Sequence, residues 1–236
     1  IQAATGHANR KRRGVGMGAA MHVSGNRTIG NWDGSSVMLK INEDGRVVLH
    51  SGEADAGQGA MTMLAQVVAH ELDIPLAHVH VAIPDTDVSP WCIGALASRV
   101  TIAGGNAAIV AARLARDKLF ALAADALKVA PGQLQLVAGV VSVQGEPARK
   151  FTLAELGRMH IWRHGGEGIQ VVGSWDSKTV MHDDKVYGNI APAYSFAAQA
   201  VVAEHGGGRR GRLHRPRWAP LHRHGCGRRL RRRAHR

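Results

Sequence analysis

Two turns of the chain place small polar residues and glycine directly before an apolar helical pattern. The first turn is 56–59 (Ala-Gly-Gln-Gly), and the second is 97–101 (Ala-Ser-Arg-Val-Thr), which Gly104 and Gly105 follow. A helix start carries unpaired backbone N–H groups and about half a positive charge, so it suits a phosphate or another anion. Glycine also lets a ligand approach the backbone. Both turns therefore indicate ligand binding, with ordinary helix capping as the alternative.

The side chains of these turns favour a ligand that has both a flat ring and a phosphate. Gln58 has one acceptor and two donors, with which it can bind the edge of a heteroaromatic ring. Ser98 and Thr101 add hydroxyl donors, and Asn106 adds an amide. The guanidinium of Arg99 can form a forked contact with a phosphate.

The elements around the turns predict an α+β fold with mixed sheets and helices. Residues 36–41 and 46–50 flank an Asp-Gly turn, which is typical of a β-hairpin. A helix is expected from the first turn to about Leu72, because apolar residues recur there at three- and four-residue spacing. Further expectations are strands at 15–24, 79–83, 170–177 and 193–203, a helix at 107–127, a hairpin within 134–143 and a helix capped by Thr152 and Glu155.

The positive charge of the chain belongs to its last segment. The 236 residues include 30 basic and 18 acidic residues, for a net charge of +12. Residues 205–236 hold 12 arginines, no lysine and no acid, so 18 basic residues face 18 acidic ones in the rest. This composition is typical of a GC-rich gene read out of frame, which we favour. A basic arm that neutralises phosphates is the alternative.

The remaining bulk features restrict compartment and completeness. The first residue is Ile1, so we expect a piece of a longer protein. No run of about 18 apolar residues predicts a membrane span, and no signal-peptide pattern occurs at the start. Two cysteines, Cys92 and Cys226, do not form a disulfide framework, so a cytoplasmic location is expected.

The amino-acid sequence around the two turns is similar to that of a known protein family. Residues 51–81 (SGEADAGQGAMTMLAQVVAHELDIPLAHVHV) and 85–112 (DTDVSPWCIGALASRVTIAGGNAAIVAA) closely resemble the molybdopterin-binding large subunit of the xanthine dehydrogenase and aldehyde oxidase family. These molybdenum hydroxylases include enzymes such as 4-hydroxybenzoyl-CoA reductase. The resemblance predicts a partial molybdopterin-binding domain at 14–204, after a linker or the end of a preceding element at 1–13. Residues 205–236 would then be a disordered or frameshifted tail.

The resemblance implies a cofactor site but no complete active site. In the family the first turn contacts the pterin, and the second holds its pyrophosphate or dinucleotide end. The positions carried over are Ala56, Gly57, Gln58, Gly59, Ala97, Ser98, Arg99 and Thr101. No protein ligand to the metal is expected, because the pterin's own dithiolene sulfurs hold molybdenum. No catalytic residue is assigned either, because the family's catalytic glutamate matches a position beyond residue 204.

The same resemblance implies the cofactors and partners of the parent protein. We expect molybdopterin, with the cytosine dinucleotide form favoured, and iron–sulfur and FAD groups on partner subunits or missing domains. The parent would be an oxidoreductase that oxidises, hydroxylates or reduces an aromatic, heteroaromatic or aldehyde substrate. An iron–sulfur subunit and a flavin subunit are the expected partners. The alternatives are a nucleic-acid-binding protein that uses its basic tail, which we do not favour, and an inactive remnant.

Overall fold

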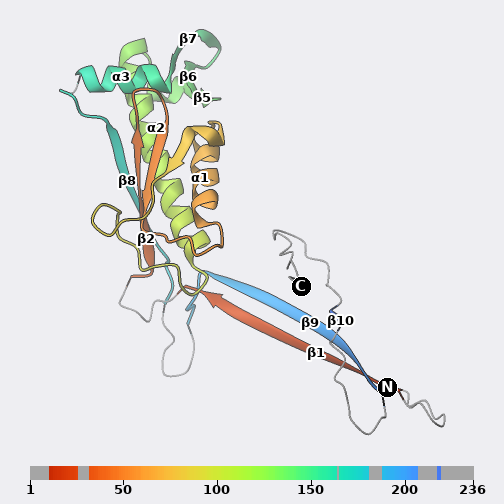
Figure 1. Ribbon diagram of the computed structural model, residues 1–236. Helices are drawn as coiled ribbons and strands as arrows, with labels where there is room; N and C mark the ends of the chain where they lie inside the picture. The colour runs from red at the N-terminus through yellow and green to blue at the C-terminus, as the bar shows by residue number, and fades with distance from the viewer. Residues whose placement is uncertain (1–10, 26–31, 164, 181–187, 207–216, 219–236) are drawn as a thin grey trace, which may run out of the picture. The chain divides into compact units, whose positions relative to one another are not determined.

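The computed structural model describes residues 11–25, 32–163, 165–180, 188–206 and 217–218. The chain divides into two compact units, one formed by residues 1–22 with 195–236 and the other by residues 23–194. Most of the predicted tail at 205–236 lies outside the described residues, so its nature stays a prediction. The mixture of helices and sheets (Figure 1) confirms the predicted α+β class.

The larger unit is built on a four-stranded sheet. Its order is β4-β3-β2-β8, with β4 at Val79–Val81, β3 at Val47–Ser51, β2 at Gly34–Ile41 and β8 at Ile169–Asp176. The predicted hairpin is confirmed, because β2 and β3 pair antiparallel around a turn that contains Gly45 at φ 82°. Strands β3 and β4 are parallel, so the chain between them must cross over, and a helix makes that connection.

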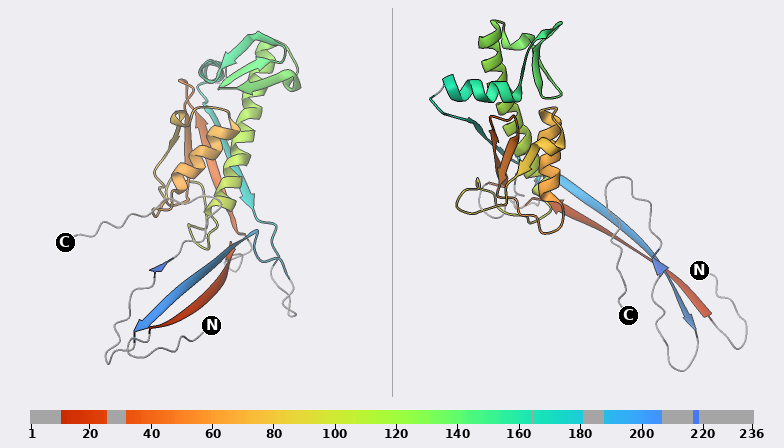
Figure 2. Two further views of the ribbon diagram at one scale, coloured as in Figure 1. Left: turned by 90° about the vertical axis from the view of Figure 1, so that its right-hand side faces the viewer. Right: turned by 45° about the horizontal axis from the view of Figure 1, so that its top comes forward.

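Two helices pack with this sheet around one apolar core (Figure 2). Helix α1 spans Ala60–Glu71 and α2 spans Gly105–Leu127. A π-helical turn, η2 (Val100–Gly104), precedes α2 directly, so the helical segment begins earlier than predicted. A short 3₁₀ turn, η1 (Leu76–His78), leads into β4. The core combines inward residues of the strands with the apolar faces of both helices: Val37, Leu39, Val47, Leu49, Leu64, Val68, Ala107, Ala111 and Leu119 are among its buried members.

Strand β8 and helix α2 approach each other closely at Gly173. A Cβ atom added to Gly173 would lie 2.3 Å from the backbone nitrogen of Ala111 and 2.8 Å from the carbonyl oxygen of Ala107. Only glycine leaves room for helix backbone at this distance. The separation between sheet and helix therefore depends on this one residue.

Gly173→Ala is expected to lower the free energy of unfolding by about 1–3 kcal/mol, because the added methyl group must push helix and strand apart. Urea unfolding of the 236-residue chain measures the change. Gly132→Ala is the matched control, since no described atom lies within 4 Å of its added Cβ. Equal stabilities of the two variants would contradict the close approach.

A small antiparallel sheet and a third helix complete the larger unit. The sheet order is β5-β6-β7, with β5 at Leu134–Val137, β6 at Val140–Val143 and β7 at Glu146–Thr152, and the 3₁₀ turn η3 (Pro131–Gln133) precedes it. The hairpin was predicted, whereas β7 was not. Helix α3 spans Leu153–Arg163. Its predicted capping box is confirmed, because the Thr152 backbone N–H donates to Glu155 Oε2 and the Glu155 N–H donates to Thr152 Oγ1.

The smaller unit is a sheet of order β1-β9-β10. Strand β1 spans Lys11–Ser24, β9 spans Ala193–Gly206 and β10 spans Arg217–Trp218. Strand β10 runs antiparallel to β9, with Arg217 opposite Val202. Both long strands were predicted. No helix within the described part of the chain is long and apolar enough to cross a membrane.

Candidate functional site

The first turn presents open backbone at the start of α1. Gly57 and Gly59 adopt backbone φ angles of 99° and 88°, which residues other than glycine rarely adopt. No described atom lies within 4 Å of a Cβ placed on either glycine. Ala56, Gly57 and Gln58 are exposed. A ligand can therefore reach the main chain of this turn without meeting a side chain.

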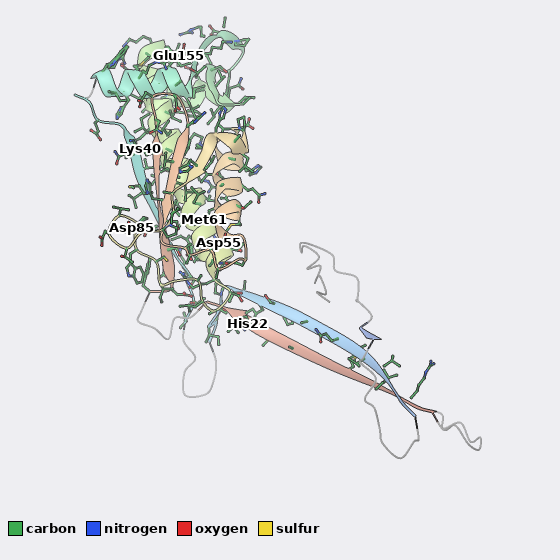
Figure 3. The ribbon with its side chains drawn as sticks, viewed as in Figure 1. His22, Lys40, Asp55, Met61, Asp85 and Glu155 are labelled. Carbon is green, nitrogen blue, oxygen red and sulfur yellow. The ribbon has the colours of Figure 1, made fainter. Side chains whose placement is uncertain are left out.

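The carboxylate of Asp55 occupies the helix start that the sequence predicted as an anion site. Its Oδ1 accepts hydrogen bonds from the backbone N–H groups of Gly57 at 2.9 Å and Gly59 at 3.2 Å. Its Oδ2 accepts from the N–H of Met61 at 3.3 Å, and both residues lie at this end of α1 (Figure 3). A negative charge of the protein itself thus meets the dipole, and a phosphate at this position would be repelled. These bonds favour the capping alternative over a bound anion at the start of α1.

The three backbone hydrogen bonds lower the pKa of Asp55, so its stabilising effect depends on pH. A carboxyl whose pKa is lowered by folding adds stability above its unfolded pKa and loses it as the pH falls through the folded pKa. Asp55→Ala is therefore expected to lower the melting temperature at pH 7, by an amount that shrinks toward pH 2.5.

Thermal unfolding between pH 7 and pH 2.5 measures this difference. Asp87→Ala, which removes an exposed carboxylate from the loop after β4, is the control. A gap between wild type and Asp55→Ala that stays constant with pH would contradict the capping role.

The side chain of Gln58 folds back onto its own turn. Its Oε1 accepts a hydrogen bond from the Ala56 N–H at 2.6 Å, and its Nε2 donates to the Ala54 carbonyl oxygen at 2.9 Å. The amide thus closes the turn while it remains exposed. Direct contact between Gln58 and a ligand requires that the side chain exchange these bonds for bonds to the ligand.

The second turn differs from the first because no side chain in the described part of the chain caps it. The residue before η2 makes no side-chain cap, and the first turn of η2 contains no acid. Ser98 and Thr101 are exposed, so their hydroxyl groups are open to a ligand. Ala97 and Ser98 adopt left-handed φ angles of 46° and 53°. This conformation costs non-glycine residues roughly 1–3 kcal/mol each and persists only where the surroundings enforce it.

Two side chains that the sequence placed toward a ligand point into the protein instead. Asn106 Nδ2 donates to the Ile102 carbonyl oxygen at 2.6 Å. Arg99 is fully buried, and its Nε donates to Asp33 Oδ1 at 2.9 Å. The predicted forked contact between Arg99 and a phosphate is therefore wrong. Buried carboxylates near the guanidinium explain the difference, because a charge removed from water needs a partner of opposite sign.

The segments that carry the two turns are in contact. Arg99 Nη1 lies 3.3 Å from Oε1 of Glu53. Glu53 lies at the beginning of the first loop, which is the segment between β3 and α1. A Cβ atom on Gly104 would lie 3.1 Å from Glu53 Cγ, and one on Gly105 would lie 3.9 Å from Met63 Sδ. Direct contacts between residues that flank the two turns therefore bring these segments together.

A buried polar cluster lies beneath this contact, and the sequence analysis missed it. Glu53 is 1% exposed and Asp33 is 2% exposed. Burial raises the pKa of Glu53, although hydrogen bonds from Ser35 and the charge of Arg99 oppose the shift. Burial also raises the pKa of Cys92, which favours a structural thiol over a nucleophile. An aspartate two residues before a glycine is a turn signal that identifies Asp55, whereas nothing in the sequence alone marks Glu53 or Asp33.

The chain is similar in sequence to known proteins. A family model described as a molybdopterin cofactor-binding domain matches residues 1–205. The chain is 35% identical over 138 residues to the 6-hydroxypseudooxynicotine dehydrogenase complex subunit gamma of Paenarthrobacter nicotinovorans, covering 58% of the chain and 17% of that subunit. It is 33% identical over 170 residues to a putative xanthine dehydrogenase molybdenum-binding subunit of Escherichia coli K12, covering 71% of the chain and 22% of that subunit.

The chain is also similar to solved structures. The chain superposes on reconstituted CO dehydrogenase from Oligotropha carboxidovorans with a TM-score of 0.67 and 26% identity, covering 82% of the chain and 24% of that protein. The chain spans 17% and 22% of the length of the two curated relatives above, so most of each relative has no counterpart here.

Proposed function

Because this chain belongs to the molybdopterin cofactor-binding domain family, we propose that its two turns together hold one phosphorylated pterin in a molybdenum-containing oxidoreductase. The observation that carries the proposal is the contrast between the adjacent turns. Asp55 already fills the first helix start, whereas no side chain among the described residues caps the second. A ligand that has both an uncharged ring and a charged phosphate matches this division.

The open backbone of the first turn and the exposed hydroxyls of the second turn support such a cofactor. Ala56, Gly57, Gln58 and Gly59 would contact the pterin ring, where the missing side chains of the two glycines leave space. Ala97, Ser98, Arg99 and Thr101 would hold the pyrophosphate, through backbone N–H groups and the two exposed hydroxyls. Arg99 would take part by supporting its neighbours, because its guanidinium is buried and its backbone N–H donates to the Leu96 carbonyl oxygen. A cytosine dinucleotide form agrees with this phosphate-binding second turn.

The bound cofactor would supply molybdenum redox chemistry, while this chain supplies binding and placement. Asp55 would keep the phosphates away from the first turn, and the hydroxyls of Ser98 and Thr101 would orient them at the second. The curated relatives include a xanthine dehydrogenase subunit and a nicotine 6-hydroxylase large subunit, whose names point to heteroaromatic substrates. We propose accordingly a parent oxidoreductase that acts on an aromatic, heteroaromatic or aldehyde substrate.

The same proposal covers partners, location and completeness. A subunit gamma of a dehydrogenase complex is among the relatives, which supports partner subunits that carry iron–sulfur and flavin groups. The small number of cysteines supports a cytoplasmic location. The catalytic base would come from a part of the large subunit outside these 236 residues, so this segment alone is proposed to be inactive.

The test is the cofactor content of the intact large subunit that contains this segment, produced in a host that makes molybdenum cofactor. Mass spectrometry of the metal and of the released pterin nucleotide is expected to give about one molybdenum and one pterin dinucleotide per subunit. Gln58→Ala is expected to reduce the pterin content while the protein stays folded, because it removes a side chain of the first turn. A folded subunit that copurifies with neither molybdenum nor pterin would overturn the proposal.

A further inference from the structure

Arg99 joins three separate segments of the chain through one buried guanidinium. Besides Asp33 and Glu53, it donates to Ser35 Oγ at 3.1 Å and to the Gly94 carbonyl oxygen at 3.1 Å. A further bond goes to the Gly34 carbonyl oxygen. These partners belong to the start of β2, to the first loop and to the loop that precedes the second turn. The side chain therefore fixes the relative positions of all three segments.

The residues immediately before Arg99 are the ones that need this support. Ala97 and Ser98 form two consecutive left-handed positions without glycine. The Ala97 carbonyl oxygen accepts a hydrogen bond from the Gly25 N–H at 2.9 Å, and the Arg99 N–H donates to the Leu96 carbonyl oxygen at 3.2 Å. These two left-handed residues are called the corner below. The backbone bonds hold one side of the corner, and the buried Arg99 side chain holds the other side. A strained corner held in this way, with an exposed serine at its tip, is typical of a preorganised ligand clamp.

Glu53 connects the corner to the first turn. Its Oε1 accepts from Ser35 Oγ and from Arg99 Nη1, and its N–H donates to Ser51 Oγ at 3.2 Å. Its Oε2 is buried and has no hydrogen-bond partner among the described residues. Such an arrangement costs stability, because a buried polar oxygen without a partner is unfavourable. This loss of stability is explained if the cluster keeps the two turns in the geometry that binds the ligand.

We propose that Asp33 and Glu53 are positioning residues for the cofactor. Through the guanidinium of Arg99 they hold the left-handed corner at Ala97 and Ser98 beside the Gly57–Gly59 turn, and they set cofactor affinity without touching the cofactor. This inference rests on the proposed function of the two turns. It also assigns Arg99 a role through its side chain that differs from phosphate binding.

The first test compares Arg99→Lys with a variant that is destabilised elsewhere in the core. Lysine keeps the charge, but its three donors on one atom cannot reproduce the five hydrogen bonds of the planar guanidinium. Cofactor retention by the intact large subunit is expected to fall about tenfold or more, the effect typical of lost positioning bonds. Leu156→Ala is the control, since Leu156 is buried in α3, on the small sheet's side of the unit. It should lower the melting temperature yet retain the pterin.

A second set of variants separates positioning from general stability. Glu53→Gln keeps the shape and Oε1 acceptor, so it should retain cofactor better than Glu53→Ala. Adding Ala97→Gly to Arg99→Lys should restore part of the cofactor retention, because glycine adopts the left-handed corner without strain. Hydrogen exchange of the amides at 97–101 should quicken in Arg99→Lys and remain unchanged in Leu156→Ala.

The outcomes distinguish this inference from the proposed function. A wild-type subunit without pterin would overturn the proposed function, and amide exchange at 97–101 would still decide whether the cluster holds the corner. A wild-type subunit with pterin whose Arg99→Lys variant loses no more pterin than Leu156→Ala would overturn the positioning role. Unchanged exchange at 97–101 in Arg99→Lys would overturn it as well.

Discussion

Replacing Arg99 by methionine is expected to lower the free energy of unfolding by about 3–5 kcal/mol, the cost of leaving buried charges without their partner. Asp33 and Glu53 are 2% and 1% exposed, so water cannot replace the guanidinium. The Gly34 and Gly94 carbonyl oxygens lose a donor at the same time. Urea unfolding of the 236-residue chain, followed by circular dichroism, measures the loss.

A matched variant tests whether the loss comes from uncompensated charge. Arg99→Met combined with Asp33→Asn and Glu53→Gln removes all three ionisable groups and should recover part of the stability. Arg113→Met is the control, because Arg113 is exposed and pairs with Glu71 at the surface, where an ion pair contributes little. Similar losses for Arg99→Met and Arg113→Met would contradict the buried cluster.

The pH dependence of Glu53 has the opposite sign to that of Asp55. Burial raises the pKa of Glu53, so its contribution to stability is complete below its unfolded pKa and is lost as the pH rises through its folded pKa. The stability of wild type relative to Glu53→Gln should therefore fall as the pH rises from 4. Thermal unfolding of both proteins from pH 4 to pH 8 measures this trend, and an opposite trend would contradict the burial of Glu53.

Removing both hydroxyls of the second turn is expected to weaken cofactor binding about 100-fold. Ser98→Ala and Thr101→Val each delete an exposed donor, and a hydrogen bond to a charged group contributes about 1.5–3 kcal/mol, which is tenfold or more in affinity. The fold should persist, because neither hydroxyl group is buried. The pterin and molybdenum content of the intact large subunit after extended dialysis measures the loss.

The control for this double variant is Thr62→Val, which removes an exposed hydroxyl from α1 outside the two turns. It should retain the cofactor like wild type. If the double variant also retained its cofactor through dialysis, the second turn would not be the phosphate site.

The hairpin, the ends of α1 and the capping box of α3 could be predicted because local chemistry determines them. The Asp-Gly turn before Arg46, the proline that follows Ile74 and the pair formed by Thr152 and Glu155 each act within a few residues. The π-helical turn before α2 could not be predicted, because its register depends on packing against the sheet. Strand β7 was missed for a related reason, since its charged sequence pairs only with a neighbour already in place.

The two turns could be located from the sequence, but the direction of their side chains could not be predicted. Glycines and hydroxyl residues before two helices identified both turns from the sequence. The orientation of Arg99 depends on Asp33, which lies 66 positions earlier in the chain, and on Glu53, 46 positions earlier. Contacts at such separation arise only from the tertiary fold. The capping role of Asp55, by contrast, is local and was open to prediction from its spacing to Gly57.

Hydrogen–deuterium exchange of the intact large subunit, with its pterin bound and after its removal, tests most directly whether both turns hold one ligand. The account predicts that amides at 56–61 and at 98–103 are both slowed when the pterin is bound and both released when it is removed. Protection of only one of these segments, or of neither, would contradict a shared site.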